Sequence, residues 1–192
     1  MSSVIYITGR GADPGAGRFL GDPTFKPIAS LGACMPNVRR MVQKGDWIFV
    51  ISGKTVSLPQ YIIGGIKVAE KITALEAFER YPSNRLRLDD DGRVIGNIPV
   101  DANGVKHPLD GHRENGFERR ALNFIVGGQS IHFDKPREIE RSREETLRVL
   151  AELKNKQGNR PIDIIGRFSK VEDEKLSSIL NWMKKVKEDT HG

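Results

Sequence analysis

The chain has 192 residues, 38% of them hydrophobic and 29% charged, which suits one folded domain or a domain with a sizeable appendage. A formal net charge of +6 favours an anionic partner such as a nucleotide or a nucleic acid. The single cysteine excludes an internal disulfide and a cysteine-based zinc cage. No window approaches the ~20 apolar residues that span a bilayer, and the N-terminus lacks the pattern of a signal peptide. We therefore expect a cytoplasmic protein with no membrane partner.

The first two-thirds of the chain predict strands separated by turns. Runs rich in β-branched and aromatic residues predict extended segments at residues 4–8, 24–31, 47–51, 61–68, 86–88, 94–100, 124–126 and 131–133. Residues 9–21 contain five glycines and predict a loop. Short helices are predicted at residues 37–43, directly after Pro36, and at residues 73–80.

The last part of the chain changes character after Pro136. Apolar residues then recur at helical intervals among charges up to Gly158, a pattern typical of an amphipathic helix. Residues 161–168 predict one more strand. Ser169, with Glu172 three residues later, forms a capping-box pattern, which predicts that a final helix begins there.

The order of these elements, β-rich first and then helix, strand and helix, predicts an α+β protein. We expect one domain at residues 1–135 and a tail at residues 136–192 that packs on the same domain. The lysines of the tail are typical of a solvated helix face, and a nucleic-acid-binding stripe is the alternative.

The loop between the predicted strands at 47–51 and 61–68 begins with Ser52, Gly53 and Lys54. A phosphate-binding P-loop would need a glycine five residues before Gly53 and a helix after it. That position holds an isoleucine, and a proline-containing loop follows, so we reject a P-loop. A small loop with an available lysine can still contact an anion, and a plain hairpin turn is the alternative.

Other polar residues are candidates for contacts with a ligand. Arg10, in the glycine-rich loop, could close over a phosphate, although a flexible surface loop is the simpler interpretation. His112 beside Arg113 could contact a base or a phosphate. Trp47 either packs in the core or stacks on a base at the mouth of a pocket.

Two kinds of chemistry receive little support from the sequence. His107, Asp110 and His112 lie close together but match no specific metal spacing, so we expect no metal. Cys34 would be a nucleophile only beside a base that lowers its pKa, and its neighbours in the chain supply none. We therefore expect Cys34 to be packed among its apolar neighbours.

Several short motifs resemble those of one family. They are residues 34–40, 45–48, 52–53, 112–113, 123–126 and 131–133. These motifs resemble the second family of nucleotide-modification-associated domains. The Gly-Asp-Trp turn at residues 45–47 and the glycine-containing strand that follows it also resemble EVE, ASCH and other PUA-like barrels. The likeness covers roughly residues 4–135 and leaves the helical tail unexplained.

The resemblance implies a PUA-like mixed β-barrel with flanking and C-terminal helices. It also implies an association with modified bases in DNA, either in reading them or in making or removing them. PUA-like barrels typically bind a base or a nucleotide in a pocket instead of catalysing a reaction. Asn37 and the hairpin at residues 89–104 depart from the family pattern, which bears on how the pocket opens.

On this basis we expect a protein that recognises a nucleotide, or a modified base in nucleic acid. Its polar residues would read base edges or hold phosphate, and an aromatic ring would stack on the base. The expected binding residues are Arg10, Phe19, Asn37, Arg39, Trp47, Ser52, Gly53, Lys54, His112 and Arg113. We expect no cofactor, and the sequence leaves a homo-oligomer open.

The alternative is an enzyme of nucleotide or DNA-base modification. His112 would carry protons with an acidic partner, either Asp110 or Asp46. A third alternative is an interaction module that captures a partner through the tail after residue 135.

Overall fold

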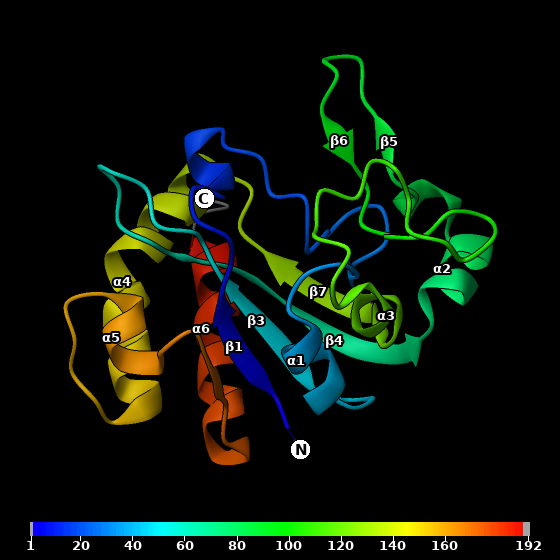
Figure 1. The fold of residues 1–192 in the computed structure, drawn as a ribbon. Coiled ribbons are helices and arrows are strands. Elements are labelled where there is room, and N and C mark those ends of the chain that lie inside the picture. The colour runs from blue at the N-terminus through cyan, green and yellow to red at the C-terminus, as the bar shows by residue number, and fades with distance from the viewer. Residues whose placement is uncertain (1, 190–192) are drawn as a thin grey trace. The chain divides into compact units, whose positions relative to one another are not determined.

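The structure, a computed structural model, describes residues 2–189 of the chain. Its strands are β1 (Val4–Ile7), β2 (Ser30–Leu31), β3 (Trp47–Ile51), β4 (Ile62–Ile72), β5 (Arg87–Leu88), β6 (Val94–Ile95), β7 (Phe124–His132) and β8 (Phe168–Lys170). Its helices are α1 (Pro36–Met41), α2 (Ala74–Arg80), α3 (Phe117–Ala121), α4 (Pro136–Lys154), α5 (Pro161–Ile165) and α6 (Asp173–Asp189) (Figure 1). Short 3-10 turns lie at Pro14–Ala16 and Pro82–Asn84.

Six strands form one mixed sheet in the order β2-β7-β4-β3-β1-β8, and β5 pairs with β6 in a separate hairpin. β1 runs parallel to β3 and antiparallel to β8. The expected α+β class is therefore confirmed. No closed barrel is detected among residues 2–189, so the PUA-like barrel stays a prediction. Within the same residues, no helix has the length and apolar character needed to cross a membrane.

The chain divides into two compact units. Within the described residues, the first unit contains residues 2–20, 46–65 and 130–189, and the second contains residues 21–45 and 66–129. This division differs from the expected boundary at residue 135, because the tail groups with the first strands of the chain. The composition of the tail changes at Pro136, but its apolar side chains pack on β1 and β3.

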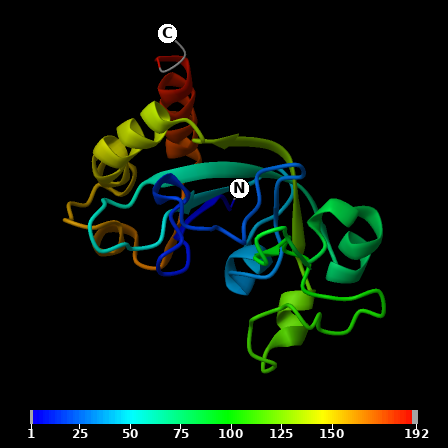
Figure 2. The same cartoon turned by 90° about the horizontal axis from the view of Figure 1, so that it is seen from above.

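The core of the first unit lies between β1 and β3 on one side and α4 and α6 on the other (Figure 2). Alternate strand residues face the helices, since side chains along a strand point to opposite faces of the sheet. These strand residues are Ile5, Ile7, Trp47, Phe49 and Ile51, and the helices contribute Val149, Leu150, Leu153, Leu176, Ile179, Met183 and Val186. Trp47 is buried and stacks on Phe49 with the ring centroids 5.8 Å apart. It is therefore a core residue, as the first of the two interpretations held.

The core of the second unit is smaller. Ala74 and Ala77 of α2 pack with Ile98, Val100, Phe124 and Val126. The predicted helix at residues 73–80 is confirmed, with Thr73 as its N-cap in a capping box with Glu76. The helix after Pro36 is also confirmed, with the proline in its first turn.

Two expectations for the tail were wrong. Residues 161–168 form α5 followed by part of β8, not one strand. Pro161, Ile164 and Ile165 are buried at the spacing of one helical turn, which a short apolar run does not distinguish from a strand. Ser169 does not cap a helix, because it pairs with Ile5 in the sheet and α6 begins only at Asp173.

Candidate active site

Three side chains of the second unit form a chain of polar contacts. Cys34 Sγ lies 3.6 Å from His112 Nε2, and His112 Nδ1 lies 2.5 Å from Asp110 Oδ1. Asp110 also accepts a hydrogen bond from the backbone N–H of His112 at 3.2 Å. A thiol, an imidazole and a carboxylate in this order are the nucleophile, base and orienting group of enzymes that use nucleophilic catalysis. We refer to these three residues as the Cys34 site.

The burial of the three residues suits these functions. The His112 side chain is 39% exposed, whereas the Asp110 side chain is only 2% exposed. Cys34 is partly buried. The imidazole can therefore reach a bound molecule, while the carboxylate behind it is shielded from water. Asp110 Oδ2 has no hydrogen-bond partner among the described residues, so His112 is the principal side-chain partner of this carboxylate.

Cys34 lies in the sharp turn between β2 and α1. Met35, the next residue, has a φ of 52°, in the left-handed region that non-glycine residues rarely adopt. Such a conformation costs about 1–2 kcal/mol for a residue with a Cβ atom, and residues of this kind cluster at functional sites. The turn lets the chain reverse within a few residues, so that Cys34 lies between a paired strand and a helix.

Asp22 holds the backbone in front of the thiol. Its Oδ1 accepts a hydrogen bond from Gly32 N–H at 3.0 Å, and its Oδ2 accepts from Ala33 N–H at 2.9 Å and from Cys34 N–H at 2.5 Å. Asn97 Nδ2 donates a further hydrogen bond to Oδ1 at 2.8 Å. Three consecutive backbone N–H groups therefore converge on one buried carboxylate, which fixes the backbone conformation of residues 32–34.

Arg39 fixes the same segment from the other side. Its guanidinium is fully buried and donates to the carbonyl of Cys34 at 2.9 Å through Nε. Its Nη1 donates to the carbonyls of Arg120, Leu122 and Asn123 at 3.1, 2.7 and 3.2 Å. These contacts bind the turn before α1 to the segment that leads from α3 into β7. A buried guanidinium used in this way supports the fold, and this position differs from the expected contact of Arg39 with a phosphate.

The loop that carries Asp110 and His112 is held by its own polar contacts. Lys106 Nζ donates to the carbonyl of Asp110 at 2.9 Å, and the guanidinium of Arg120 donates to the carbonyl of Arg113. The ring of His107 accepts a hydrogen bond from Leu109 N–H at 3.1 Å, which identifies it as part of a turn. Among residues 2–189 no cluster of three or more His, Cys, Asp or Glu side chains could hold a metal ion.

The electrostatics of the site keep the resting thiol neutral. Burial, and then the negative charge of Asp22, raise the pKa of Cys34 to about 12, although the nearby charge of Arg39 opposes them. For Asp110, burial raises the pKa, but the hydrogen bonds from His112 outweigh it and the pKa is lowered. An ionised Asp110 accepts a proton-bearing Nδ1, so Nε2 is left as the acceptor that faces the thiol.

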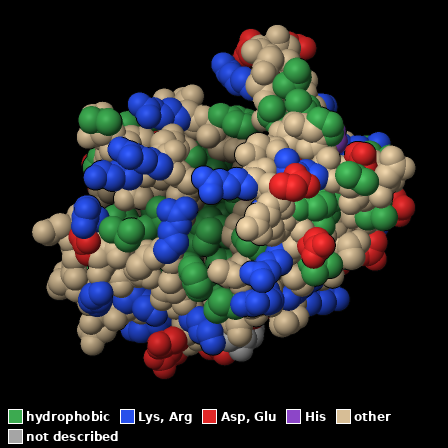
Figure 3. Space-filling model, viewed as in Figure 1, with side chains coloured by type: hydrophobic (Ala, Val, Ile, Leu, Met, Phe, Trp, Pro, Cys, Tyr) green, Lys and Arg blue, Asp and Glu red, His purple; other side chains and the backbone are tan. Residues whose placement is uncertain are grey.

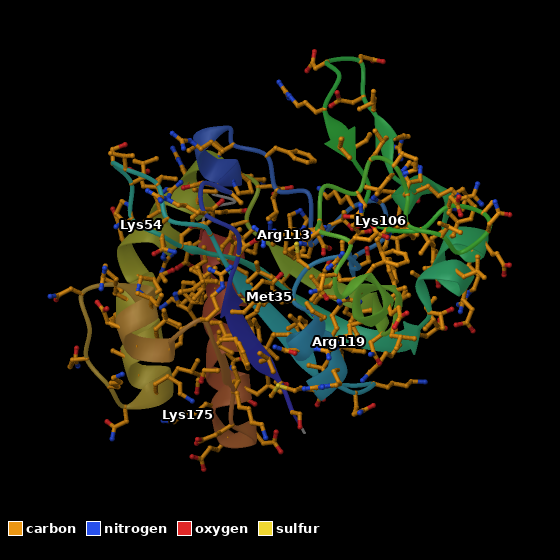
Figure 4. The ribbon with its side chains drawn as sticks, in the orientation of Figure 1. Met35, Lys54, Lys106, Arg113, Arg119 and Lys175 are labelled. Atoms are coloured by element: carbon orange, nitrogen blue, oxygen red, sulfur yellow. The ribbon has the colours of Figure 1, made fainter. Side chains whose placement is uncertain are left out.

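The expected binding residues fall into both units. Arg10, Phe19, Trp47, Ser52, Gly53 and Lys54 belong to the first unit, and Asn37, Arg39, His112 and Arg113 belong to the second. Figure 4 labels Met35 and Arg113, the chain neighbours of Cys34 and His112, and also Lys54 in the first unit. Arg113 and Asn37 are exposed.

In the first unit the structure brings Arg10, Gly53 and Lys54 into neighbouring loops. β1 and β3 are parallel, so the loops that follow them leave the sheet at the same edge. Gly11 N–H donates to the carbonyl of Lys54 at 3.2 Å, and Gly53 N–H donates to the carbonyl of Ala12 at 2.7 Å. The side chains of Arg10 and Lys54 are exposed.

The other expected binding residues of the first unit lie in different surroundings. Ser52 is buried, and its Oγ accepts a hydrogen bond from Tyr61 N–H at 3.0 Å, so it supports the turn. Phe19 is exposed and Trp47 lies in the core. Asp46, one of the two acidic partners considered for His112, accepts a hydrogen bond from Ser2 N–H at 2.7 Å.

The residue that sequence reasoning missed is Cys34. His112, whose Nε2 lies 3.6 Å from Cys34 Sγ, is 78 residues away in the chain, so no local pattern could reveal the pair. Of the two acidic partners expected for His112, Asp110 is in contact with the imidazole. The chain matches no family model, and no curated protein or solved structure matches it either. The interpretation of the Cys34 site therefore depends on its own geometry.

Proposed function

We propose that this protein is an enzyme in which Cys34 is the nucleophile, His112 is the general base and Asp110 orients the imidazole. The observation that carries the proposal is the geometry of the site, with 3.6 Å between Cys34 Sγ and His112 Nε2 and 2.5 Å between His112 Nδ1 and Asp110 Oδ1. Enzymes of unrelated folds use this constellation, which is recognised by geometry and not by position in the sequence.

The reaction that fits these groups is substitution at an electrophilic sp² carbon, as in an amide or an amidine. The thiol proton passes to His112 Nε2 while Sγ forms a bond to the carbon, and the π electron pair of the C=O or C=N bond moves onto the oxygen or nitrogen. This pair re-forms the double bond when the leaving group departs. The carbon–nitrogen bond then breaks, and the leaving nitrogen takes the proton from the imidazolium. A water molecule, deprotonated by His112, attacks the same carbon and releases Sγ, which recovers a proton. Asp110 stays ionised throughout and stabilises the imidazolium.

For the substrate we propose a base or nucleotide that carries such a carbon. The support comes from the resemblance of residues 34–40 and 112–113 to the nucleotide-modification-associated domains, because these two motifs contain the nucleophile and the base. Bases with an exocyclic amino group present an amidine-like carbon. Arg113 is exposed next to His112 and can contact a phosphate. Figure 3 shows Lys and Arg side chains scattered over the visible face.

A second candidate function is binding without catalysis, in a PUA-like pocket. It is favoured by the neighbouring loops of the first unit, which present Arg10 and Lys54 beyond the ends of two parallel strands. Ligands of open α/β sheets commonly bind at this edge. Titration of Arg10→Ala and Lys54→Ala variants with a fluorescent oligonucleotide tests this candidate. Loss of affinity in both variants supports it, and unchanged affinity contradicts it.

Mass spectrometry tests the enzymatic proposal. Wild-type protein is incubated with DNA, RNA and free nucleotides that contain native or modified bases, and both the nucleosides and the intact protein are weighed. We expect a changed nucleoside and a covalent adduct on Cys34, both absent in Cys34→Ala. Cys34→Ala that yields the same product as wild type, or no product and no adduct across the whole panel, would overturn the proposal.

A further inference from the structure

The loop between β3 and β4 presents two large aliphatic side chains to water. Val56 is 97% exposed and Leu58 is 42% exposed. The other exposed large apolar side chains of the described residues lie singly along the chain. A single exposed apolar residue is normal on a protein surface, whereas apolar side chains that gather at one place indicate contact with another molecule. Val56 and Leu58 are therefore candidates for such a contact.

Hydrogen bonds hold this loop in the conformation that exposes the two side chains. Thr55 is buried, and its Oγ1 donates to the carbonyl of Leu58 at 3.2 Å. The guanidinium of Arg143 donates to the carbonyl of Pro59, the next residue. Because the backbone is held in this way, the loop loses less conformational entropy on binding than a flexible loop would.

Cations flank the aliphatic side chains. Lys54 is exposed on the same loop, and Arg10 and Arg18 are exposed on the glycine-rich loop, which backbone hydrogen bonds join to it. None of the three cations forms an ion pair within residues 2–189. The acid of these two loops, Asp13, is only 1% exposed and pairs with Arg143. Figure 3 shows hydrophobic side chains beside Lys and Arg side chains over these loops, at the upper left.

Exposed aliphatic side chains beside unpaired cations fit an anionic lipid surface better than a protein or a nucleic acid. A stable protein interface buries about 800 Å² on each partner, far more than two side chains supply. Single-stranded nucleic acid is bound through cations and stacked aromatic rings, and aliphatic side chains do not stack in this way. A bilayer accepts apolar side chains at its headgroup region, and its anionic headgroups attract cations.

We infer that Val56 and Leu58 enter the headgroup region of an anionic bilayer, while the neighbouring cations bind the lipid phosphates. This contact is made by the first unit and does not depend on the reaction proposed for the Cys34 site. It differs from the expectation of no membrane partner, which depends on the lack of a spanning segment and of a signal peptide. A loop that lies at a lipid surface needs neither of them.

Co-sedimentation with lipid vesicles tests the inference. We expect the protein to bind vesicles of phosphatidylcholine and phosphatidylglycerol, and to bind them more weakly as salt is added. Vesicles of phosphatidylcholine alone lack the anionic headgroups and should bind at least about tenfold more weakly. Equal binding to the two kinds of vesicle, or no binding to the anionic kind, overturns the inference.

A double variant tests whether the aliphatic side chains enter the bilayer. Val56→Ser combined with Leu58→Ser keeps every charge, and we expect its affinity for the anionic vesicles to fall at least about tenfold. Val105→Ser is the control, because Val105 is 60% exposed in the second unit, and its affinity should stay within about twofold of wild type. An unchanged affinity in the double variant, or an equal loss in Val105→Ser, overturns the inference.

The same double variant separates a lipid from a nucleic acid. Arg10 and Lys54 would also hold an oligonucleotide, so replacing these cations does not distinguish the two partners. We expect Val56→Ser combined with Leu58→Ser to bind a fluorescent oligonucleotide within about twofold of wild type. Weaker binding of the oligonucleotide, with no binding of vesicles by the wild type, assigns the loop to nucleic acid and overturns the inference. Vesicle binding without oligonucleotide binding supports the inference and removes the second candidate function.

Discussion

Arg143 of α4 and Asp13 of the glycine-rich loop are 130 residues apart in the chain, and Arg143 Nη2 donates to Asp13 Oδ1 at 2.6 Å. The same guanidinium lies over the ring of Tyr61, 4.5 Å from its centroid, and donates to the carbonyl of Pro59. Tyr61 Oη in turn accepts a hydrogen bond from Gly15 N–H at 3.0 Å. Arg143 of α4 thus contacts and stabilises both of the loops that follow β1 and β3.

Breaking this ion pair is expected to be costly. The side chains of Asp13 and Arg143 are 1% and 11% exposed, so Arg143→Met leaves a buried carboxylate without its cation. Loss of one partner of a buried pair typically costs about 3–5 kcal/mol. Urea unfolding measures the free energy. Arg148→Met is the control, since Arg148 is 55% exposed and its ion pairs should contribute less than about 1 kcal/mol. Equal losses in the two variants contradict the prediction.

The two histidines of the 101–116 loop give a matched test of the active site. His112→Ala removes the proposed base, and we expect turnover to fall by about 10³-fold or more. His107→Ala removes only a ring that accepts Leu109 N–H, so turnover should stay within about threefold of wild type. Asp110→Asn should also lower turnover by up to about 10⁴-fold, because the wrong tautomer of His112 is favoured. Steady-state kinetics on the substrate found by mass spectrometry measures all three, and a larger loss in His107→Ala than in His112→Ala contradicts the assignment.

The carboxylate of Glu138 makes the first unit sensitive to acid. Burial raises its pKa, but the hydrogen bond from Lys187 and those from Asp134 N–H and Lys135 N–H outweigh burial and lower it below 4.5. Its stabilising contribution is thus fully present above pH 4.5 and is lost as the pH falls through the lowered pKa of the folded state. We expect Glu138→Gln to be less stable than wild type at pH 7, by about 1–3 kcal/mol, and to lose less stability below pH 4.5. Urea midpoints at pH 7, 5 and 3.5 test this, and parallel losses in both proteins contradict it.

Gly9 and Gly53 lie in facing loops, and we expect replacement by alanine to affect stability differently at the two positions. A Cβ atom on Gly53 would lie 1.8 Å from the carbonyl oxygen of Gly9, so Gly53→Ala must push the loops apart. Overpacking of this kind costs about 1–3 kcal/mol, occasionally more. A Cβ atom on Gly9 would meet no atom within 4 Å, and we expect Gly9→Ala to change stability by less than about 0.5 kcal/mol. Thermal unfolding measures both variants. A Gly53→Ala variant as stable as wild type contradicts the close approach, and a destabilised Gly9→Ala variant contradicts the open space at Gly9.

The sequence predicted correctly those elements that are determined by residues close together in the chain. The strand at residues 47–51, the helix after Pro36 and the helix at residues 73–80 follow from neighbours a few residues apart, and the structure confirms them. The helix Pro161–Ile165 was mistaken for a strand because a buried helix of five residues is too short to show the repeat of apolar positions that distinguishes a helix from a strand.

The active site could not be predicted because its contacts are not local. Cys34 looked like a packed residue among apolar neighbours, and only the fold brings a histidine to it. Arg39 looked like a phosphate ligand because it is a cation beside a family motif, but its guanidinium is buried among backbone carbonyls. Composition gives the number of cationic side chains in a chain. It does not tell which of them are buried in hydrogen bonds within the fold and which are exposed to a ligand.

The contacts of Arg39 also determine where the chain tolerates insertions and deletions. One side chain contacts both the turn at residues 33–34 and the segment at residues 120–123, so an added or deleted residue in either would pull the guanidinium off its carbonyls and displace Cys34. The tip of the β5–β6 hairpin is exposed at residues 90–92, and residues 89–93 close on their own hydrogen bonds. An affinity tag or a fluorescent reporter therefore belongs in that hairpin.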